Sequence, residues 1–135
     1  MTRFHWGTSL ASFLIAALIF IIIAYTARGA YRDYQELLLG SRIIESMRPM
    51  IVAKRMVETN ISAGMSNPCQ NIQRAYSNGY EMSCHDGRIT SRITLPETPR
   101  PIVLVLFRHA GSTEWHCTSS ENERYIPLAC RPYDA

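Results

Sequence analysis

Hydrophobic residues run without interruption near the start of the chain. From Trp6 to Ala27 there is no charged residue, which makes 22 consecutive uncharged positions, and residues 9–27 are mainly Leu, Ile, Ala and Phe. At about 1.5 Å per residue, a helix of that length spans roughly 33 Å, against roughly 30 Å for the hydrocarbon core of a bilayer. Tyr25 and Trp6 fall near the two ends, where interfacial aromatic residues are found. The pattern predicts a transmembrane helix.

A cleaved secretory signal peptide is the alternative for this run. Its apolar part would cover only about 7–15 residues and would end at a cleavage site of small residues. The run in this chain is longer, and the segment ARGA at residues 27–30 makes a poor cleavage site. We therefore interpret the run as a helix that the mature protein retains.

Helical spacing of apolar residues continues beyond the uncharged run. Between residues 30 and 59, charged residues separate apolar ones at intervals typical of an amphipathic helix. Pro49 interrupts the pattern, and because proline lacks an N–H and clashes with the preceding turn, we expect a kink there. Such an apolar stripe needs a surface to pack on. Its members are Tyr31, Tyr34, Leu37, Leu38, Ile43, Ile44, Met47, Ile51, Val52 and Val57.

The remaining part of the chain mixes turns with short strands. Residues 60–87 are rich in Asn, Gly and Ser turn signals, and we expect an irregular loop there. Three strands are predicted after it, at residues 88–95, 102–107 and 113–118. Strands with one apolar face need a cover, which the amphipathic helix can provide. The predicted fold class is therefore α+β, with a long N-terminal helix packed on a small antiparallel sheet.

Four cysteines lie in the polar part of the chain, at positions 69, 84, 117 and 130. None belongs to a CxxC pair, so the sequence lacks the spacing typical of tetrahedral zinc sites. An even number of cysteines in a small domain indicates disulfide bonds and an oxidising compartment. Three pairings are possible, of which Cys69–Cys84 with Cys117–Cys130 is the local one. The Arg and Lys residues after the apolar run point the other way, because the positive-inside rule would leave this part in the cytoplasm.

Composition and charge narrow the classes of function. Only residues 61–135 follow the helical region, which is too short a segment for most multi-step enzymes. The net charge is +3, and the basic residues are interleaved with acidic ones along the chain. A nucleic-acid-binding protein concentrates basic residues in a patch, so we expect no contact with DNA or RNA.

The order of these parts resembles a known protein family. The most specific signal is the ending, in which WHC at residues 115–117 is followed by YIPLACR at residues 125–131. Tyr31 and Tyr34 form a pair just beyond the apolar run, and Pro49 falls where a second kink is common in the family. With its half-apolar helix, the chain is similar to bacterial type IV pilins and minor pilins.

The resemblance implies a division of the chain and a set of partners. Residues 1–7 would be a short leader, 8–28 a transmembrane helix, 29–60 its amphipathic continuation, and 61–135 a disulfide-stapled head. The implied partners are other pilin subunits, the inner membrane, a prepilin peptidase, and the assembly motor and platform of the pilus. The head would lie in the periplasm or on an extracellular pilus. No cofactor and no metal are expected.

The same resemblance assigns roles to single residues of the helix. The peptidase would cut between Gly7 and Thr8. Pilins carry a Glu five residues after the cleavage Gly and a Phe directly after it, whereas this chain has Ser12 and Thr8 there. This departure favours a minor or tip subunit and keeps open the alternative of an uncleaved single-pass accessory protein. The residues expected to support assembly are Leu10, Ser12, Phe13, Tyr31 and Tyr34.

Three short motifs suggest other chemistry. VLVLFRHAG at residues 103–111 resembles the phosphate-binding motif of histidine phosphatases, in which His109 would be the nucleophile and Arg108 a clamp. Only 24 residues follow it, too few to supply the other catalytic groups, so we expect no enzyme and no catalytic residue. His85, His109 and His116 lack the i, i+4 spacing of helical metal ligands. The triplet NIS at residues 60–62 fits a glycosylation acceptor.

Overall fold

The computed structural model describes residues 6–77 and 79–132, with side chains from residue 10 onward. The chain divides into two compact units, Met1–Leu37 and Leu38–Ala135. One helix, α1 (Trp6–Ser62), contributes residues to both units. Most of the predicted leader, residues 1–5, lies outside the described residues.

Helix α1 includes the whole range predicted to be helical and extends it slightly at both ends. Pro49 lies inside α1, and the chain is helical on both sides of it. A proline removes one backbone hydrogen bond from the ladder, and the packing of the neighbouring turns on the sheet compensates for that loss. The kink expected at Pro49 stays a prediction.

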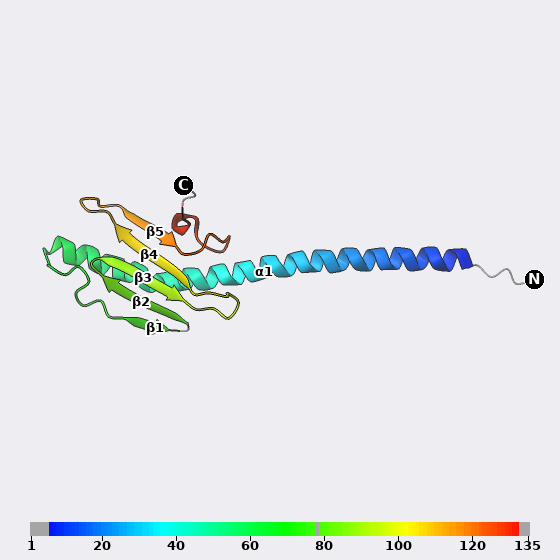
Figure 1. The fold of residues 1–135 in the computed structure, drawn as a ribbon, viewed down its shortest axis with the longest axis horizontal. Helices are drawn as coiled ribbons and strands as arrows, with labels where there is room; N and C mark the ends of the chain where they lie inside the picture. The colour runs from blue at the N-terminus through cyan, green and yellow to red at the C-terminus, as the bar shows by residue number, and fades with distance from the viewer. Residues whose placement is uncertain (1–5, 78, 133–135) are drawn as a thin grey trace, which may run out of the picture. The chain divides into compact units, whose positions relative to one another are not determined.

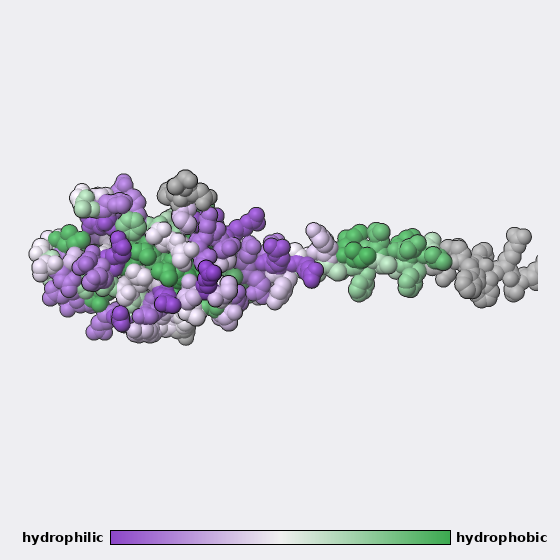
Figure 2. All heavy atoms as spheres, in the orientation of Figure 1, coloured by the Kyte–Doolittle hydropathy of each residue, from purple (hydrophilic) through white to green (hydrophobic). Residues whose placement is uncertain are grey.

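The first unit is a helix with an exposed apolar surface. Every described residue from 10 to 34 is exposed, including Phe13 and Tyr25. Figure 2 shows the visible face of this helix as hydrophobic over much of its described length and hydrophilic toward its C-terminal end. The hydroxyl of Thr26 donates to the carbonyl of Ile22 at 3.0 Å, so this polar group is satisfied within the helix. By length and composition, α1 could cross a membrane.

The second unit contains a five-stranded antiparallel sheet. Each strand pairs with its neighbours in sequence, in the order β1-β2-β3-β4-β5 (Figure 1). The sheet is therefore a meander, in which every connection joins adjacent strands. The strands are β1 (Ala75–Ser77), β2 (Tyr80–His85), β3 (Arg88–Ile93), β4 (Ile102–Arg108) and β5 (Trp115–Ser119).

The sequence predicts three of these strands and misses two. Strands β3, β4 and β5 fall within about two residues of the predicted ranges. The irregular loop predicted for residues 60–87 is wrong, because this range contains β1 and β2. Asp86 and Gly87 both have positive φ and form the tight turn that joins β2 to β3. The turn signal at residues 86–87 therefore belongs to a hairpin, whereas the one at residues 66–68 lies in the connection between α1 and β1.

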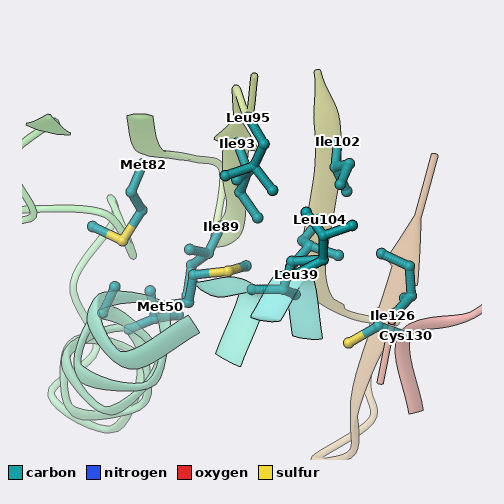
Figure 3. Packing of buried hydrophobic residues seen from close by; sticks show 13 residues of the cluster. Leu39, Met50, Met82, Ile89, Ile93, Leu95, Ile102, Leu104, Ile126 and Cys130 are labelled. Atoms are coloured by element: carbon teal, nitrogen blue, oxygen red, sulfur yellow. The ribbon is translucent and has the colours of Figure 1, made fainter. Parts of the chain in front are cut away.

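The core of the second unit lies between α1 and one face of the sheet (Figure 3). Helix α1 contributes Leu39, Ile43, Met50, Ala53 and Val57, whose spacings place them on one side of the helix. Side chains of β2, β3 and β4 meet them, and the C-terminal segment closes the edge near β5. These partners are Met82, Ile89, Ile93, Leu95, Ile102, Leu104, Ile126 and Cys130.

Only part of the predicted apolar stripe lies in this core. Ile43 and Val57 are fully buried, whereas Ile44, Ile51 and Val52 stay exposed. The ten predicted positions span more than one side of the helix, and a single sheet covers only one side. The sequence pattern thus overestimates the covered surface. We call Ile44, Ile51 and Val52 the outer stripe.

Candidate functional site

The residues predicted to support assembly lie on the surface of α1 in the first unit. Leu10, Phe13, Tyr31 and Tyr34 are large and exposed, and Ser12 is exposed as well. The hydroxyl of Tyr31 accepts a hydrogen bond at 2.9 Å from the side-chain amide one helical turn later, that of Gln35. All five residues belong to α1, but Leu10 and Ser12, two positions apart, point to nearly opposite sides of the helix. Gly7 and Thr8, the predicted processing pair, belong to the start of α1, where side chains are not described.

The outer stripe adds an exposed apolar surface in the second unit. Ile44 and Ile51 are seven residues apart, which is close to two helical turns, so they lie on the same side of α1. Sequence reasoning assigns them to the covered stripe together with Ile43. Spacing alone does not separate the two sets, because the buried Ile43, Met50 and Val57 also recur every seven residues.

Two disulfides close the head, and both follow the local pairing. Cys69–Cys84 joins the segment after α1 to β2, and Cys117–Cys130 joins β5 to the short helix η1 (Leu128–Cys130). All four cysteines are therefore paired. The sulfur of Cys69 also accepts a hydrogen bond at 3.2 Å from the N–H of Gly87, which ties the first disulfide to the β2–β3 turn.

The C-terminal segment after β5 is fixed by burial and by an arginine. Ile126 and Cys130 are buried in the core. The guanidinium of Arg131 donates to the carbonyl of Ile126 at 2.8 Å and to that of Arg124 at 2.7 Å, which closes the loop on itself. Burial, followed by the carboxylates of Glu123 and Glu121, raises the pKa of Tyr125 in the same loop.

A polar contact ties β5 to the helix. The indole N–H of Trp115 donates to Oε1 of Glu58 at 2.8 Å, although the two residues are 57 positions apart. Lys54 and Arg108 place their cationic groups 5.7 and 5.9 Å from the centre of the Trp115 ring. The sequence carries no signal for this cluster, because it depends on how the sheet packs on α1.

The arginine of the RHAG motif is held by the backbone. Both Nε and Nη2 of Arg108 donate to the carbonyl of Ser112, at 3.0 and 2.7 Å. The ring of His109 packs edge-on against Phe107 at 5.3 Å and lies 4.8 Å from the ring of His116. Among the described residues, no three His, Cys, Asp or Glu side chains gather as metal ligands would.

Asn60, the first residue of the glycosylation triplet, is a structural residue. Its side chain is nearly buried, and Nδ2 donates to the carbonyls of Pro68 and Gln70, both at 2.9 Å. A glycan on Nδ2 would displace these hydrogen bonds and would not fit the buried site. The folded chain therefore does not offer Asn60 as an acceptor.

The chain matches no protein-family model, no curated protein and no solved structure. Three features of the structure therefore bear on function. These features are the exposed apolar helix of the first unit, the outer stripe of the second unit, and the two disulfides that close the head.

Proposed function

We propose that this chain is a structural subunit of a type IV pilus or related pseudopilus, at a minor or tip position, which assembles through its N-terminal apolar helix. The observation that carries the proposal is the change of environment along α1. Its first part exposes apolar side chains throughout residues 10–27, while its second part packs on a disulfide-closed sheet. A helix of the first kind needs lipid or other helices around it.

Burial provides the energetic reason for assembly. Each large apolar side chain gains about 1.5–3 kcal/mol when it leaves water, so the helix first enters the bilayer. In a filament, packing between helices replaces contact with lipid. The outer stripe supports this proposal, because its three large apolar side chains stay exposed on a side of α1 that the sheet does not cover.

The proposal includes the path of the subunit. A prepilin peptidase would cut between Gly7 and Thr8 at the inner membrane. The motor and platform of the pilus would then move the helix from lipid into the filament, with the head in the periplasm or outside the cell. Both disulfides support an oxidising compartment for the head.

The first test is the intact mass of native protein from membranes and from sheared surface material, measured without reducing agent. We expect a chain that begins at Thr8 in the sheared fraction, with both disulfides formed. A chain that begins at Met1 and occurs only in membranes would contradict the proposal.

A second test changes the outer stripe. We expect Ile44→Glu with Ile51→Glu to remove the chain from the sheared fraction while its amount in membranes stays the same, because charged side chains cannot pack in an apolar helix interface. Gln73→Glu, at an exposed position of the head, is the matched control and should change neither fraction. Near-UV circular dichroism of both variants checks whether the head still folds.

An uncleaved accessory protein of the pilus machinery is the second candidate, and Ser12 favours it. Pilins carry a carboxylate at this position, which is thought to pair with the amino terminus of a neighbouring subunit. Without it, the chain would lack one contact for docking into a filament. This candidate predicts a Met1 terminus, no protein in sheared material, and no effect of the double substitution in the outer stripe.

A further inference from the structure

A cavity of about 880 Å³ opens at one end of the sheet, within the second unit. The β2–β3 turn at Asp86 and Gly87 forms one wall, and the loop after β4, residues 109–112, forms another. None of the residues assigned to assembly lines it. The proposed function therefore leaves this cavity without a role.

A row of four side chains crosses the sheet beside the cavity. His85 of β2 is paired with Arg88 of β3, and Phe107 of β4 is paired with His116 of β5. The pairing of Ile89 with Leu106 brings Arg88 next to Phe107. Because side chains alternate along a strand, the row lies on the face opposite the core, to which the buried Ile89 belongs.

The guanidinium of Arg88 is positioned at the centre of this row. It lies 5.6 Å from the centre of the Phe107 ring, a cation–π contact that restricts the side chain. Among the described residues, no carboxylate lies within ion-pair distance of Arg88. Its N–H donors thus face solvent at the edge of the cavity. Arg108 differs, because two of its donors are bound to the carbonyl of Ser112.

The charge around the cavity is positive. Arg88 and Arg108 line it together with His85 and His109, against the single lining carboxylate of Asp86. That carboxylate lies 3.3 Å from Nε2 of His85, so the pair is close to self-compensating when the histidine is protonated. An anion entering the cavity therefore meets two guanidinium groups and few opposing charges.

The geometry also limits the kind of anion. Arg88 covers the Phe107 ring, so the ring is not a free platform on which a nucleobase could stack. The donors that remain are a guanidinium fork, the N–H of the His109 ring and the hydroxyl of Thr90, all of which line the cavity. Such donors match the oxygens of a compact oxyanion.

We propose that this cavity binds a tetrahedral oxyanion, a phosphoryl or sulfo group, with the guanidinium of Arg88 as its main anchor and the ring of His109 as a second donor. The group is a free inorganic anion or an ester carried on a polysaccharide. The site binds this group and does not transfer it. The site includes His109 of the RHAG motif, but its anchor is Arg88 of β3 and not Arg108, which donates to the carbonyl of Ser112.

The test is equilibrium dialysis of the full chain in detergent micelles with labelled inorganic sulfate, at constant ionic strength. Arg88→Gln removes the anchor. Arg92→Gln is the matched control, because Arg92 is exposed on the same face of β3 and lines a different depression. We expect Arg88→Gln to weaken binding by about tenfold or more, His109→Gln by less, and Arg92→Gln by less than about twofold.

Competition identifies the source of the group. If dextran sulfate displaces labelled sulfate at far lower sulfate-group concentrations than inorganic sulfate or phosphate does, and neutral dextran does not, the group belongs to a polymer. If all sulfated probes and phosphate compete equally per group, it is a free anion. Either result supports the proposed site, provided that Arg88→Gln weakens the binding.

Two results would overturn the proposal. One is no saturable binding up to about 50 mM sulfate. The other is an equal loss of binding in Arg88→Gln and Arg92→Gln, which would indicate general charge attraction. Unchanged near-UV circular dichroism in each variant excludes loss of the fold as the cause. Neither result depends on filament assembly, so the proposed function stands or fails separately.

Discussion

The two parts of α1 have the same backbone conformation and opposite environments. Phe20 in the first unit is 76% exposed, whereas Ile43 in the second is fully buried. In the second unit the sheet and the C-terminal segment supply the surface that covers the helix. In the first unit the described chain supplies no such cover. Apolar residues in a helix therefore do not by themselves show whether the chain stabilises itself or depends on its surroundings.

The largest expected effect comes from truncating one apolar residue in each part. Ile43→Ala should lower the free energy of unfolding of the head by about 2–5 kcal/mol, because it leaves a cavity in the core. Phe20→Ala should change it by less than about 0.5 kcal/mol. Urea unfolding of the full chain in micelles, followed by near-UV circular dichroism, measures both. If both variants lower the free energy of unfolding equally, the two parts of α1 do not differ in how much they stabilise the head.

The second prediction concerns the C-terminal disulfide of the head. Replacing Cys117 and Cys130 by Ala should lower the free energy of unfolding by about 3 kcal/mol, since the bond closes a loop of 13 residues. The far-UV signal of the first unit should not change. The same unfolding experiment, with the other disulfide intact, provides the value. A reducing agent that leaves the wild-type midpoint unchanged would argue against this contribution.

A smaller effect is expected at the contact between β5 and α1. Trp115→Phe keeps most of the ring but loses the hydrogen bond to Glu58, which should cost about 1–2 kcal/mol because the acceptor is charged. A double-mutant cycle with Glu58→Ala, which removes the acceptor, isolates the coupling energy. If the two substitutions are additive, the contact contributes nothing to holding the sheet on the helix.

The smallest effect has the opposite sign. The hydroxyl of Ser91 is buried in the second unit and has no hydrogen-bond partner among the described residues. Ser91→Ala should therefore raise the free energy of unfolding by about 1 kcal/mol. Ser46→Ala is the control, because Ser46 is also buried but donates to the carbonyl of Ile43 at 2.6 Å. If both variants raise the free energy of unfolding by the same amount, the unsatisfied hydroxyl of Ser91 does not destabilise the head.

Local patterns in the sequence were sufficient for the helix, three strands and both disulfides. The uncharged run and the spacing of apolar residues define α1, and the apolar run at residues 102–107 defines β4. The local pairing of four cysteines is also correct. Strand β2 was missed because its inward residues, Met82 and Cys84, lie among turn residues that favoured a loop.

Features that depend on pairing between distant segments were not predictable from one sequence. The row of His85, Arg88, Phe107 and His116 exists only in one register of the sheet, and a shift by one residue would move these side chains to the other face. The exposure of the outer stripe depends on which side of α1 the sheet covers. The hydrogen bond between Trp115 and Glu58 requires both arrangements.

The meander has a consequence for how the head reaches its fold. Each strand pairs only with the strand next to it in sequence, and both disulfides join residues 15 or fewer positions apart. Hairpins of this kind form early, because the ends of a short loop meet at little entropic cost. The docking of α1 on the sheet brings together residues as far apart as Glu58 and Trp115. We therefore expect the sheet to form hairpin by hairpin, with the helix docking last.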